Sequence, residues 1–260
     1  MGVSYGQVRN IRPRRRKAAP VFGLWLFLLM VCSLAAYFFL HSAFFSITAL
    51  EVKGNKTIAA EKIIEQSGLS VGANLFKINT GEARKRLSLH PILKETEISR
   101  QLPNTIVISV SERIPVAVVA ASSCLIVVDQ EGFYLQKTAD NQEIGLPVIS
   151  DISLNGDESP GVNIITPGLR SALDLIEMMD QSFLDNLAEI TAPTPNTLAL
   201  KTKQGVEIRF GEPADMARKV KVMQELLVKN GAVINNQTVE YIDLRYDTAP
   251  VVKRKIENTE

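Results

Sequence analysis

Few side chains in this sequence have the types and spacing that catalysis needs. The 260 residues include two histidines, His41 and His90, and neither has an acidic partner at the spacing of a metal site. The chain contains no H-E-x-x-H, S-x-x-K or G-x-x-x-x-G-K motif, and its two G-x-S-x-G matches, at residues 2–6 and 68–72, do not follow a predicted strand as a nucleophile elbow requires. We therefore predict that the protein is not an enzyme and has no catalytic residue, cofactor, metal or small-molecule substrate. One alternative stays open, a cell-wall enzyme with an unrecognised site, because two carboxylates can converge from distant positions.

The two cysteines are also poor candidates for chemistry. Cys32 lies inside a long apolar run and Cys124 lies in SSCLIVVD, so we expect no disulfide between them. Next to such an apolar segment, Cys124 is interpreted as a buried, inert thiol, with a reactive nucleophile as the alternative.

Binding through the backbone is the more promising chemistry, and it falls near the end of the chain. The segment TVEYIDLRYD alternates, with Ile242, Leu244 and Tyr246 expected on one face of a strand and Tyr241, Asp243 and Arg245 on the other. If residues 239–246 form the last strand of a sheet, its free edge offers N–H and C=O groups to which an extended partner can add a strand. Alternatively, Asp243 and Arg245 pair with neighbouring side chains and only keep the edge soluble.

A twenty-residue apolar run must position this edge relative to a membrane. Val21–Leu40 reads VFGLWLFLLMVCSLAAYFFL without a charge, and a helix of that length covers the roughly 30 Å of a bilayer's hydrocarbon core. Six Arg and Lys precede the run and no acidic residue does, so the positive-inside rule places the tail in the cytoplasm and the rest outside. A cleaved signal peptide and a buried core helix are the alternatives.

The charge balance beyond this run argues against nucleic acid as a partner. Six of the 29 Lys and Arg lie before the run, which leaves 23 against 28 acidic residues. The basic cluster RPRRRK fits an orientation signal and contact with anionic lipid, with nucleic-acid binding as the alternative.

The elements after the run follow the order strand, helix, helix, strand, strand. Residues 47–55 predict a strand that ends in a turn, and Thr57 is a candidate N-cap for a helix that ends at Ser67 before Gly68. A second helix is expected from Thr80 to Leu89, since Pro91 prevents its continuation. ILKETEISRQ and NTIVISVSER then predict two strands, which gives a three-stranded sheet with both helices on one face.

The remainder is rich in short strands. AVVAAS, CLIVVD, GFYLQK, residues 146–149, LAEITA, NTLALKT and GVEIRFG each predict one. Two helices interrupt them, one capped by Thr166 with Pro167 in its first turn and one from Pro213 to Asn230. The methionines of the second helix are interpreted as core, with an adaptable binding groove as the alternative.

These stretches resemble a known family. FSITALEVKGN, GANLFKI and SRQLPNTIVISVSERIPVAVV are similar to the POTRA domain of the FtsQ/DivIB cell-division proteins, and SERIPVA is the most specific piece. LIVVDQEGFYL and YIDLRYD resemble that family's second, β domain. The resemblance implies an α+β protein with a single transmembrane helix, a POTRA domain (β-α-α-β-β) and then a β-rich domain with two helices. The expected domains are a basic cytoplasmic tail (1–20), the transmembrane helix (21–40), the POTRA domain (45–115), the β domain (116–248) and a flexible tail (249–260).

The resemblance also implies a function. We expect a bitopic scaffold of the bacterial divisome, in the cell membrane and enriched at the septum, that recruits FtsB/DivIC-like and FtsL-like partners. The alternative is a POTRA-containing chaperone or transport component for exported polypeptides. The expected partner-binding residues are Tyr241, Asp243, Arg245, Tyr246, Val251 and Val252. Pro250 departs from the family pattern, and because it has no N–H an added strand must end before it or turn that position away.

Overall fold

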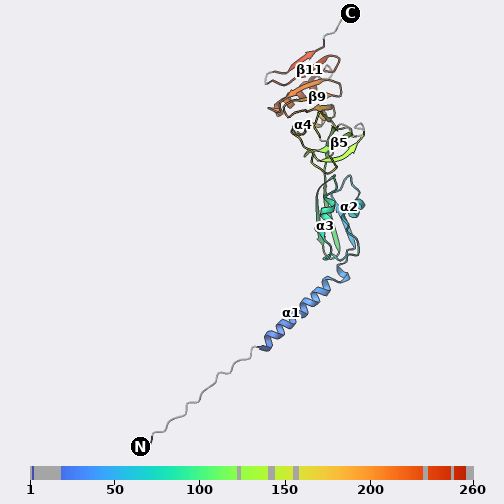
Figure 1. Ribbon diagram of the computed structural model, residues 1–260, viewed down its shortest axis with the longest axis vertical. Helices are drawn as coiled ribbons and strands as arrows, with labels where there is room; N and C mark the ends of the chain where they lie inside the picture. The colour runs from blue at the N-terminus through green and yellow to red at the C-terminus, as the bar shows by residue number, and fades with distance from the viewer. Residues whose placement is uncertain are drawn as a thin grey trace. The chain divides into compact units, whose positions relative to one another are not determined.

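The structure is a computed structural model that describes Gly2 and residues 19–121, 124–139, 144–154, 158–230, 234–246 and 249–255. The basic cluster before residue 19, Thr248 and the last five residues lie outside the described residues, so the predictions made on them are not addressed. Figure 1 traces the elements in chain order. The helices are α1 (Ala19–Leu40), η1 (Ala43–Phe45), α2 (Ala60–Ser67), α3 (Thr80–Leu87), α4 (Pro167–Glu177), α5 (Gln181–Leu184) and α6 (Met216–Asn230).

The strands form two sheets. β1 (Ala49–Lys53), β2 (Leu93–Gln101) and β3 (Thr105–Glu112) make a three-stranded sheet in the order β1-β3-β2. The others make a nine-stranded sheet in the order β12-β11-β10-β9-β8-β7-β4-β5-β6. Their bounds are β4 (Pro115–Ala121), β5 (Cys124–Asp129), β6 (Tyr134–Thr138), β7 (Val148–Ser150), β8 (Leu187–Thr191), β9 (Leu198–Thr202), β10 (Glu207–Gly211), β11 (Val239–Asp243) and β12 (Val251–Arg254).

The first helix, α1, includes the apolar run. Within it, Phe22–Leu40 is long and apolar enough to cross a membrane, and its side chains from Phe22 onward are exposed. Among the described residues it is the one helix of this kind. The predicted helix over this run is therefore confirmed as a helix.

The β-α-α-β-β order of the first sheet is confirmed, with two corrections at helix ends. Thr57 is not an N-cap, because α2 begins at Ala60 with Ala59 as its N-cap. The carboxylate of Glu112 explains this, since it accepts the backbone N–H groups of residues 56–58 at 2.8 to 3.1 Å and holds them in a turn before the helix. The second helix, α3, ends at Leu87 and not at Leu89, with its N-cap at Asn79.

The nine-stranded sheet has its main core on one face. Alternate side chains of its strands, such as Ile126, Ile190 and Ile208, are buried together with Leu173 of α4 and Met223 of α6. The methionines of α6 are therefore core residues and do not line an open groove. Val118, Val127 and Leu135 form a small cluster on the opposite face of β4, β5 and β6.

The predicted caps of the two long helices had different outcomes. The hydroxyl of Thr166 accepts the N–H of Leu169, so the predicted start of α4 with Pro167 in its first turn is confirmed. The predicted start of α6 at Pro213 is wrong. Asp215 has a φ of +52°, a left-handed conformation that a helix cannot include, so α6 begins at Met216.

The largest correction concerns the end of the chain. Residues 239–246 were expected to form the last strand with a free edge, but β11 ends at Asp243 and lies between β10 and β12. The prediction of a flexible tail from residue 249 is wrong for Val251–Arg254, which pair antiparallel with β11. The charged residues after Val252 suggest a tail, but the two β-branched valines favour a short strand.

Candidate functional site: the edge strand β12

The free edge on this side of the sheet belongs to β12. Its register with β11 pairs Tyr241 with Lys253, Ile242 with Val252 and Asp243 with Val251. Just beyond the strand, the N–H of Lys255 donates to the carbonyl of Thr238 at 3.0 Å.

The direction of the β12 backbone groups follows from that last bond. Residues along an antiparallel strand alternate between bonding the neighbouring strand and facing away from it. Since Lys255 bonds toward β11, Lys253 and Val251 have the same orientation, and the N–H and C=O groups of Val252 and Arg254 face outward. Among the described residues no strand lies beyond β12, so two residues offer main-chain groups to an added strand.

The side chains of β12 divide between the two faces of the sheet. Val252 is half-buried and packs against the main core on the same face as Ile242. Val251 is 54% exposed and has Asp243 as its cross-strand partner. Tyr246, three residues after β11, is 64% exposed and does not share the buried face with Ile242 that the alternation predicted.

Asp243 and Arg245 pair with each other. Nη2 of Arg245 lies 2.6 Å from Oδ2 of Asp243, and Nε and the backbone N–H of Arg245 both donate to Oδ1 at 3.0 Å. The hydrogen bonds from the Arg245 side chain lower the pKa of the Asp243 carboxyl and raise the pKa of the guanidinium. The planar fork of Arg245 is thus engaged within the chain by Asp243.

A glycine makes room for this pair. Gly211, at the end of β10, has a φ of +74°, and a Cβ at this position would come within 2.9 Å of Cγ of Arg245. The close approach of the arginine stem and the left-handed conformation both favour glycine here. The only sequence signal for this contact is the position of Gly211 at the end of the predicted strand GVEIRFG, where a glycine can mark a close approach.

Tyr241 lies between cations on the other face of the sheet from the core. The guanidinium carbon of Arg209 is 3.9 Å from the centre of the tyrosine ring, and Nζ of Lys253 is 5.4 Å from it. Lys253 also pairs with Glu240 at 2.9 Å, which raises the pKa of its ammonium group. Five of the six predicted binding residues therefore lie together on β11, β12 and the residue that braces them, and Tyr246 follows with Arg245 5.6 Å from its ring.

The opposite edge of the sheet is covered. The N–H of Tyr134 in β6 donates to the carbonyl of Val162, and its own carbonyl accepts from Gly161. Phe133 and Asn163 form an isolated antiparallel bridge, and the ladder with β5 is bulged between Tyr134 and Gln136. A covering segment and a bulge are two devices that block strand addition at an edge.

The motif SERIPVA contributes Arg113 to a partly buried ion cluster, a contact that its local pattern did not predict. Nη1 of Arg113 lies 2.6 Å from Oδ2 of Asp129 and 3.0 Å from Oε2 of Glu131, and the guanidinium covers the ring of Phe133 at 3.6 Å. The Arg113 side chain is 10% exposed. Hydrogen bonds from Lys94 and then Arg113 lower the pKa of Glu131. SERIPVA and VDQEGF, far apart in the sequence, are thus two halves of one contact.

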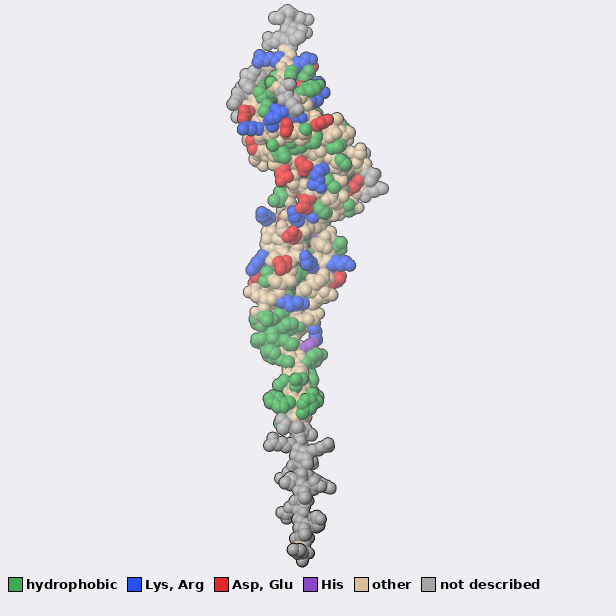
Figure 2. All heavy atoms as spheres, turned by 90° about the vertical axis from the view of Figure 1, so that its left-hand side faces the viewer, with side chains coloured by type: hydrophobic (Ala, Val, Ile, Leu, Met, Phe, Trp, Pro, Cys, Tyr) green, Lys and Arg blue, Asp and Glu red, His purple; other side chains and the backbone are tan. Residues whose placement is uncertain are grey.

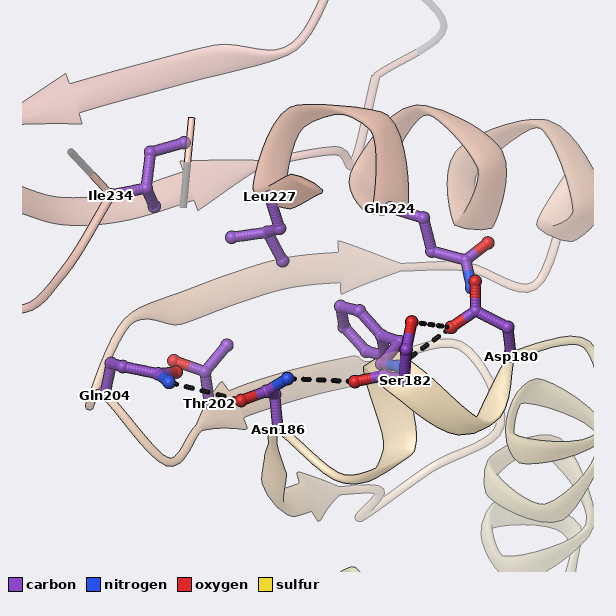
Figure 3. Close-up of a pocket in the computed structure, with 9 residues that line it drawn as sticks. Asp180, Ser182, Asn186, Thr202, Gln204, Gln224, Leu227 and Ile234 are labelled. Carbon is purple, nitrogen blue, oxygen red and sulfur yellow. Dashed lines mark hydrogen bonds between the residues drawn. The ribbon is translucent and has the colours of Figure 1, made fainter. Parts of the chain in front are cut away.

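A cavity of about 230 Å³ lies beside α5 and α6, and several polar side chains of its lining are hydrogen-bonded to one another or to nearby backbone (Figure 3). Asp180 accepts from the hydroxyl of Ser182 and the N–H of Phe183, which caps α5. Asn186 donates to the carbonyl of Ser182 and accepts from Gln204. The one carboxylate of the lining, Asp180, is thus held by two hydrogen bonds, one of them from the Ser182 hydroxyl.

The histidines and cysteines have different local surroundings. His41 bonds the carbonyl of Tyr37, and burial lowers the pKa of His90. Cys32 lies on the exposed surface of α1, while Cys124 is half-buried against the main core. Within the described residues no group of three or more potential metal ligands occurs.

Comparison with known proteins agrees with this architecture. Residues 45–113 match the family model of the FtsQ-type POTRA domain, and residues 117–245 match the model of the C-terminal part of the cell division proteins FtsQ/DivIB. The two matched segments meet at the ion cluster of Arg113 and extend to the brace of Arg245.

Curated relatives are similar over most of their length. The cell division protein DivIB of Clostridium tetani is 26% identical over 86% of this chain and 85% of its own. FtsQ of Corynebacterium glutamicum is 23% identical over 89% of this chain and 99% of its own. The solved major extracytoplasmic domain of DivIB from Geobacillus stearothermophilus is 15% identical, with a TM-score of 0.34, over 48% of this chain and 99% of that one.

Proposed function

Because this chain belongs to the FtsQ/DivIB family of cell division proteins, we propose that it is a single-pass scaffold that recruits FtsB/DivIC-like and FtsL-like partners by strand addition at β12. The observation that carries this proposal is the outward-facing backbone of Val252 and Arg254 at the free edge of the nine-stranded sheet. The partner's segment becomes a tenth strand, and its main chain supplies the hydrogen bonds.

Side chains around the edge select the partner. Val251 and Tyr246 are exposed and supply apolar contact area, and Tyr241 and Val252 support them from the sheet. Lys253 and Arg254 are exposed cations, so a partner segment with acidic residues is favoured at this edge. Asp243 and Arg245 hold the end of β11 in place and act on the partner through that geometry.

Pro250 limits the start of β12. Proline has no N–H to donate, and β12 begins at Val251, immediately after it. The partner strand is therefore expected to pair along Val251–Arg254 and to leave the sheet near Pro250.

The remaining parts of the proposal concern location. α1 anchors the chain in the cell membrane with its N-terminus in the cytoplasm, and both sheets lie outside the cytoplasm, where division partners assemble at the septum. The uncharged length of Phe22–Leu40 and the six cations before it support this orientation.

A matched pair of variants at one position tests the edge. Arg254→Pro removes the outward N–H and the cationic side chain, whereas Arg254→Ala removes the side chain alone. Losing one main-chain hydrogen bond is worth about 1 kcal/mol or more, so the proline variant should bind the FtsB/DivIC-like partner of the same organism at least about fivefold more weakly than the alanine variant. Equal affinities for the two variants, measured by titration calorimetry on folded protein, would contradict strand addition at this edge.

A further inference from the structure

The end of α1 is joined firmly to two loops that come later in the chain. The side chain of Asn74 donates to the carbonyl of Leu40, the last residue of the helix, at 3.0 Å. The N–H of Leu75 donates to the carbonyl of Phe45, and the N–H of Ile47 donates to the carbonyl of Ala73, both at 2.8 Å. Ser46 and Asn74 form an antiparallel bridge.

The turn between β2 and β3 joins the same assembly. The N–H of Thr48 donates to the carbonyl of Asn104 at 2.9 Å, and Arg100 donates to the carbonyls of Leu75 and Ile78. The segment that ends at Leu50 accordingly forms one compact unit with Ser70–Ile78 and Arg100–Ile106. The helix exit and these loops are therefore tied together by several backbone and side-chain hydrogen bonds.

This unit exposes apolar side chains at a high density. Ten large apolar side chains are exposed after α1 among the described residues, and four of them lie in its three short segments. These four are Phe44 (58% exposed), Val71 (62%), Phe76 (43%) and Leu102 (62%), which we call the collar. The other six are spread over residues 89–251.

The collar continues the apolar surface of the helix. The ring of Phe39, in the last turn of α1, lies 5.9 Å from that of Phe44 and 5.2 Å from that of Phe45. Phe45 in turn contacts Phe44 and Phe76, each at 5.0 Å between ring centres. Figure 2 shows hydrophobic side chains continuing from α1 onto the part of the molecule next to it.

The charges of these segments have one sign. Residues 41–50, 70–78 and 100–106 contain no Asp or Glu, and their two cations are Lys77 and Arg100. Segments that lie in the membrane interface bury Phe and Leu side chains at the boundary of headgroups and acyl chains, and Lys and Arg next to a span are attracted to anionic phosphates. An apolar surface that borders a membrane span and carries only cations matches a lipid surface in both respects.

We propose that the collar lies in the interface of the bilayer around α1, with its apolar side chains at the acyl boundary and Lys77 and Arg100 beside lipid phosphates. The proposal rests on the membrane anchor of the proposed function. It makes the base of the POTRA domain a second, peripheral membrane contact and identifies lipid as the ligand of that surface.

Quenching of tryptophan fluorescence by brominated lipids tests the collar in the full chain. Trp25, in α1, is the one tryptophan, so Trp25→Phe gives a background in which Phe76→Trp or Leu102→Trp reports one collar position. Leu89→Trp is the matched control, because Leu89 is a 73% exposed apolar residue outside this unit. The vesicles contain phosphatidylcholine and phosphatidylglycerol with bromines near the headgroup end of the acyl chains.

The two collar tryptophans should be quenched at least about threefold more than the Leu89→Trp control. Quenching no stronger than that of the control overturns the collar. The wild-type protein in the same vesicles separates this failure from failure of the anchor: if Trp25 is quenched while the collar positions are not, only the collar is wrong. If Trp25 is not quenched, the anchor is wrong and the collar falls with it.

Discussion

The two edges of the nine-stranded sheet differ in how their backbone groups are treated. At β6, both main-chain groups of Tyr134 are bonded by residues 161 and 162, and a bulge follows at once. At β12, the groups of Val252 and Arg254 face outward, and the edge has no covering segment among the described residues. One edge is therefore protected by a covering segment, while the other is limited by its four-residue length, its two cations and a bulge in its ladder with β11 between Val239 and Tyr241.

This difference indicates which edge of the sheet can accept a partner strand. Lysine and arginine at an edge repel a second copy of the same edge, but they do not repel an acidic partner. A covering segment excludes every partner. The charges at the β12 edge thus disfavour pairing with a second copy of this edge but still allow an acidic partner strand to bind. The covered β6 edge does not allow either.

The largest expected effect comes from removing β12. A chain that stops after Pro250 lacks the edge strand and should not bind the FtsB/DivIC-like partner, whereas a chain that stops after Lys255 should bind as the full chain does. Pull-down with the purified partner measures both. Retained binding by the shorter chain, with its near-UV circular dichroism unchanged, would be incompatible with this edge as the site.

The covered edge should respond to loss of the side chain that holds its cover. Ile164 is 5% exposed in the main core, and its N–H donates to the carbonyl of Gly132. Ile164→Ala should lower the free energy of unfolding by about 3 kcal/mol and accelerate hydrogen exchange at Tyr134. Partner affinity at β12 should stay within twofold of wild type. A large loss of affinity in the folded variant would show that the two edges are not independent.

The brace between Asp243 and Arg245 should affect stability more than recognition. Asp243→Asn removes a charged acceptor of four hydrogen bonds, and because Arg245 is 45% exposed we expect a loss of about 1 to 2 kcal/mol at pH 7. Thermal unfolding measures this loss. A loss of partner binding without any loss of stability would reverse the roles assigned to this pair.

The pH dependence of that loss has a defined sign. Because the Arg245 side chain lowers the pKa of Asp243 in the folded state, the stabilisation is complete above the ordinary aspartate pKa of about 3.9 and disappears as pH falls through the lower, folded pKa. The stability difference between wild type and Asp243→Asn should therefore be constant near neutral pH and shrink below about pH 4. A difference that grows toward acid pH would contradict the assigned pair.

The smallest effect is expected at Lys253. Its pair with Glu240 is exposed, so Lys253→Ala should leave the free energy of unfolding close to that of wild type. The same variant should slow association with an acidic partner at low salt and have less effect at high salt, as stopped-flow kinetics can show.

Much of this architecture follows from local patterns in the sequence. The strands from Ile47 to Glu112 and the helix capped by Thr166 were predicted because their alternation and capping residues act within a few positions. Thr57 failed as a cap because the carboxylate of Glu112, 55 residues away, binds the same turn. A contact at that separation leaves no periodic signal.

The candidate site shows the same division. The segment around Tyr241 was identified correctly as a strand, but its place in the sheet depends on whether Val251–Arg254 forms a neighbour, and a four-residue strand between a proline and a charged end has little pattern of its own. The ion pair of Arg113 with Asp129 and the fit of Arg245 over Gly211 likewise depend on tertiary approach.

Hydrogen exchange in the complex reports directly on partner recruitment through β12. With the FtsB/DivIC-like partner bound, the amides of Val252 and Arg254 should become protected, while those of Gln136 and Lys137 in β6 should exchange as in the free protein. Unchanged exchange along Val251–Arg254 in a saturated complex, or new protection along β6, would contradict recruitment through β12.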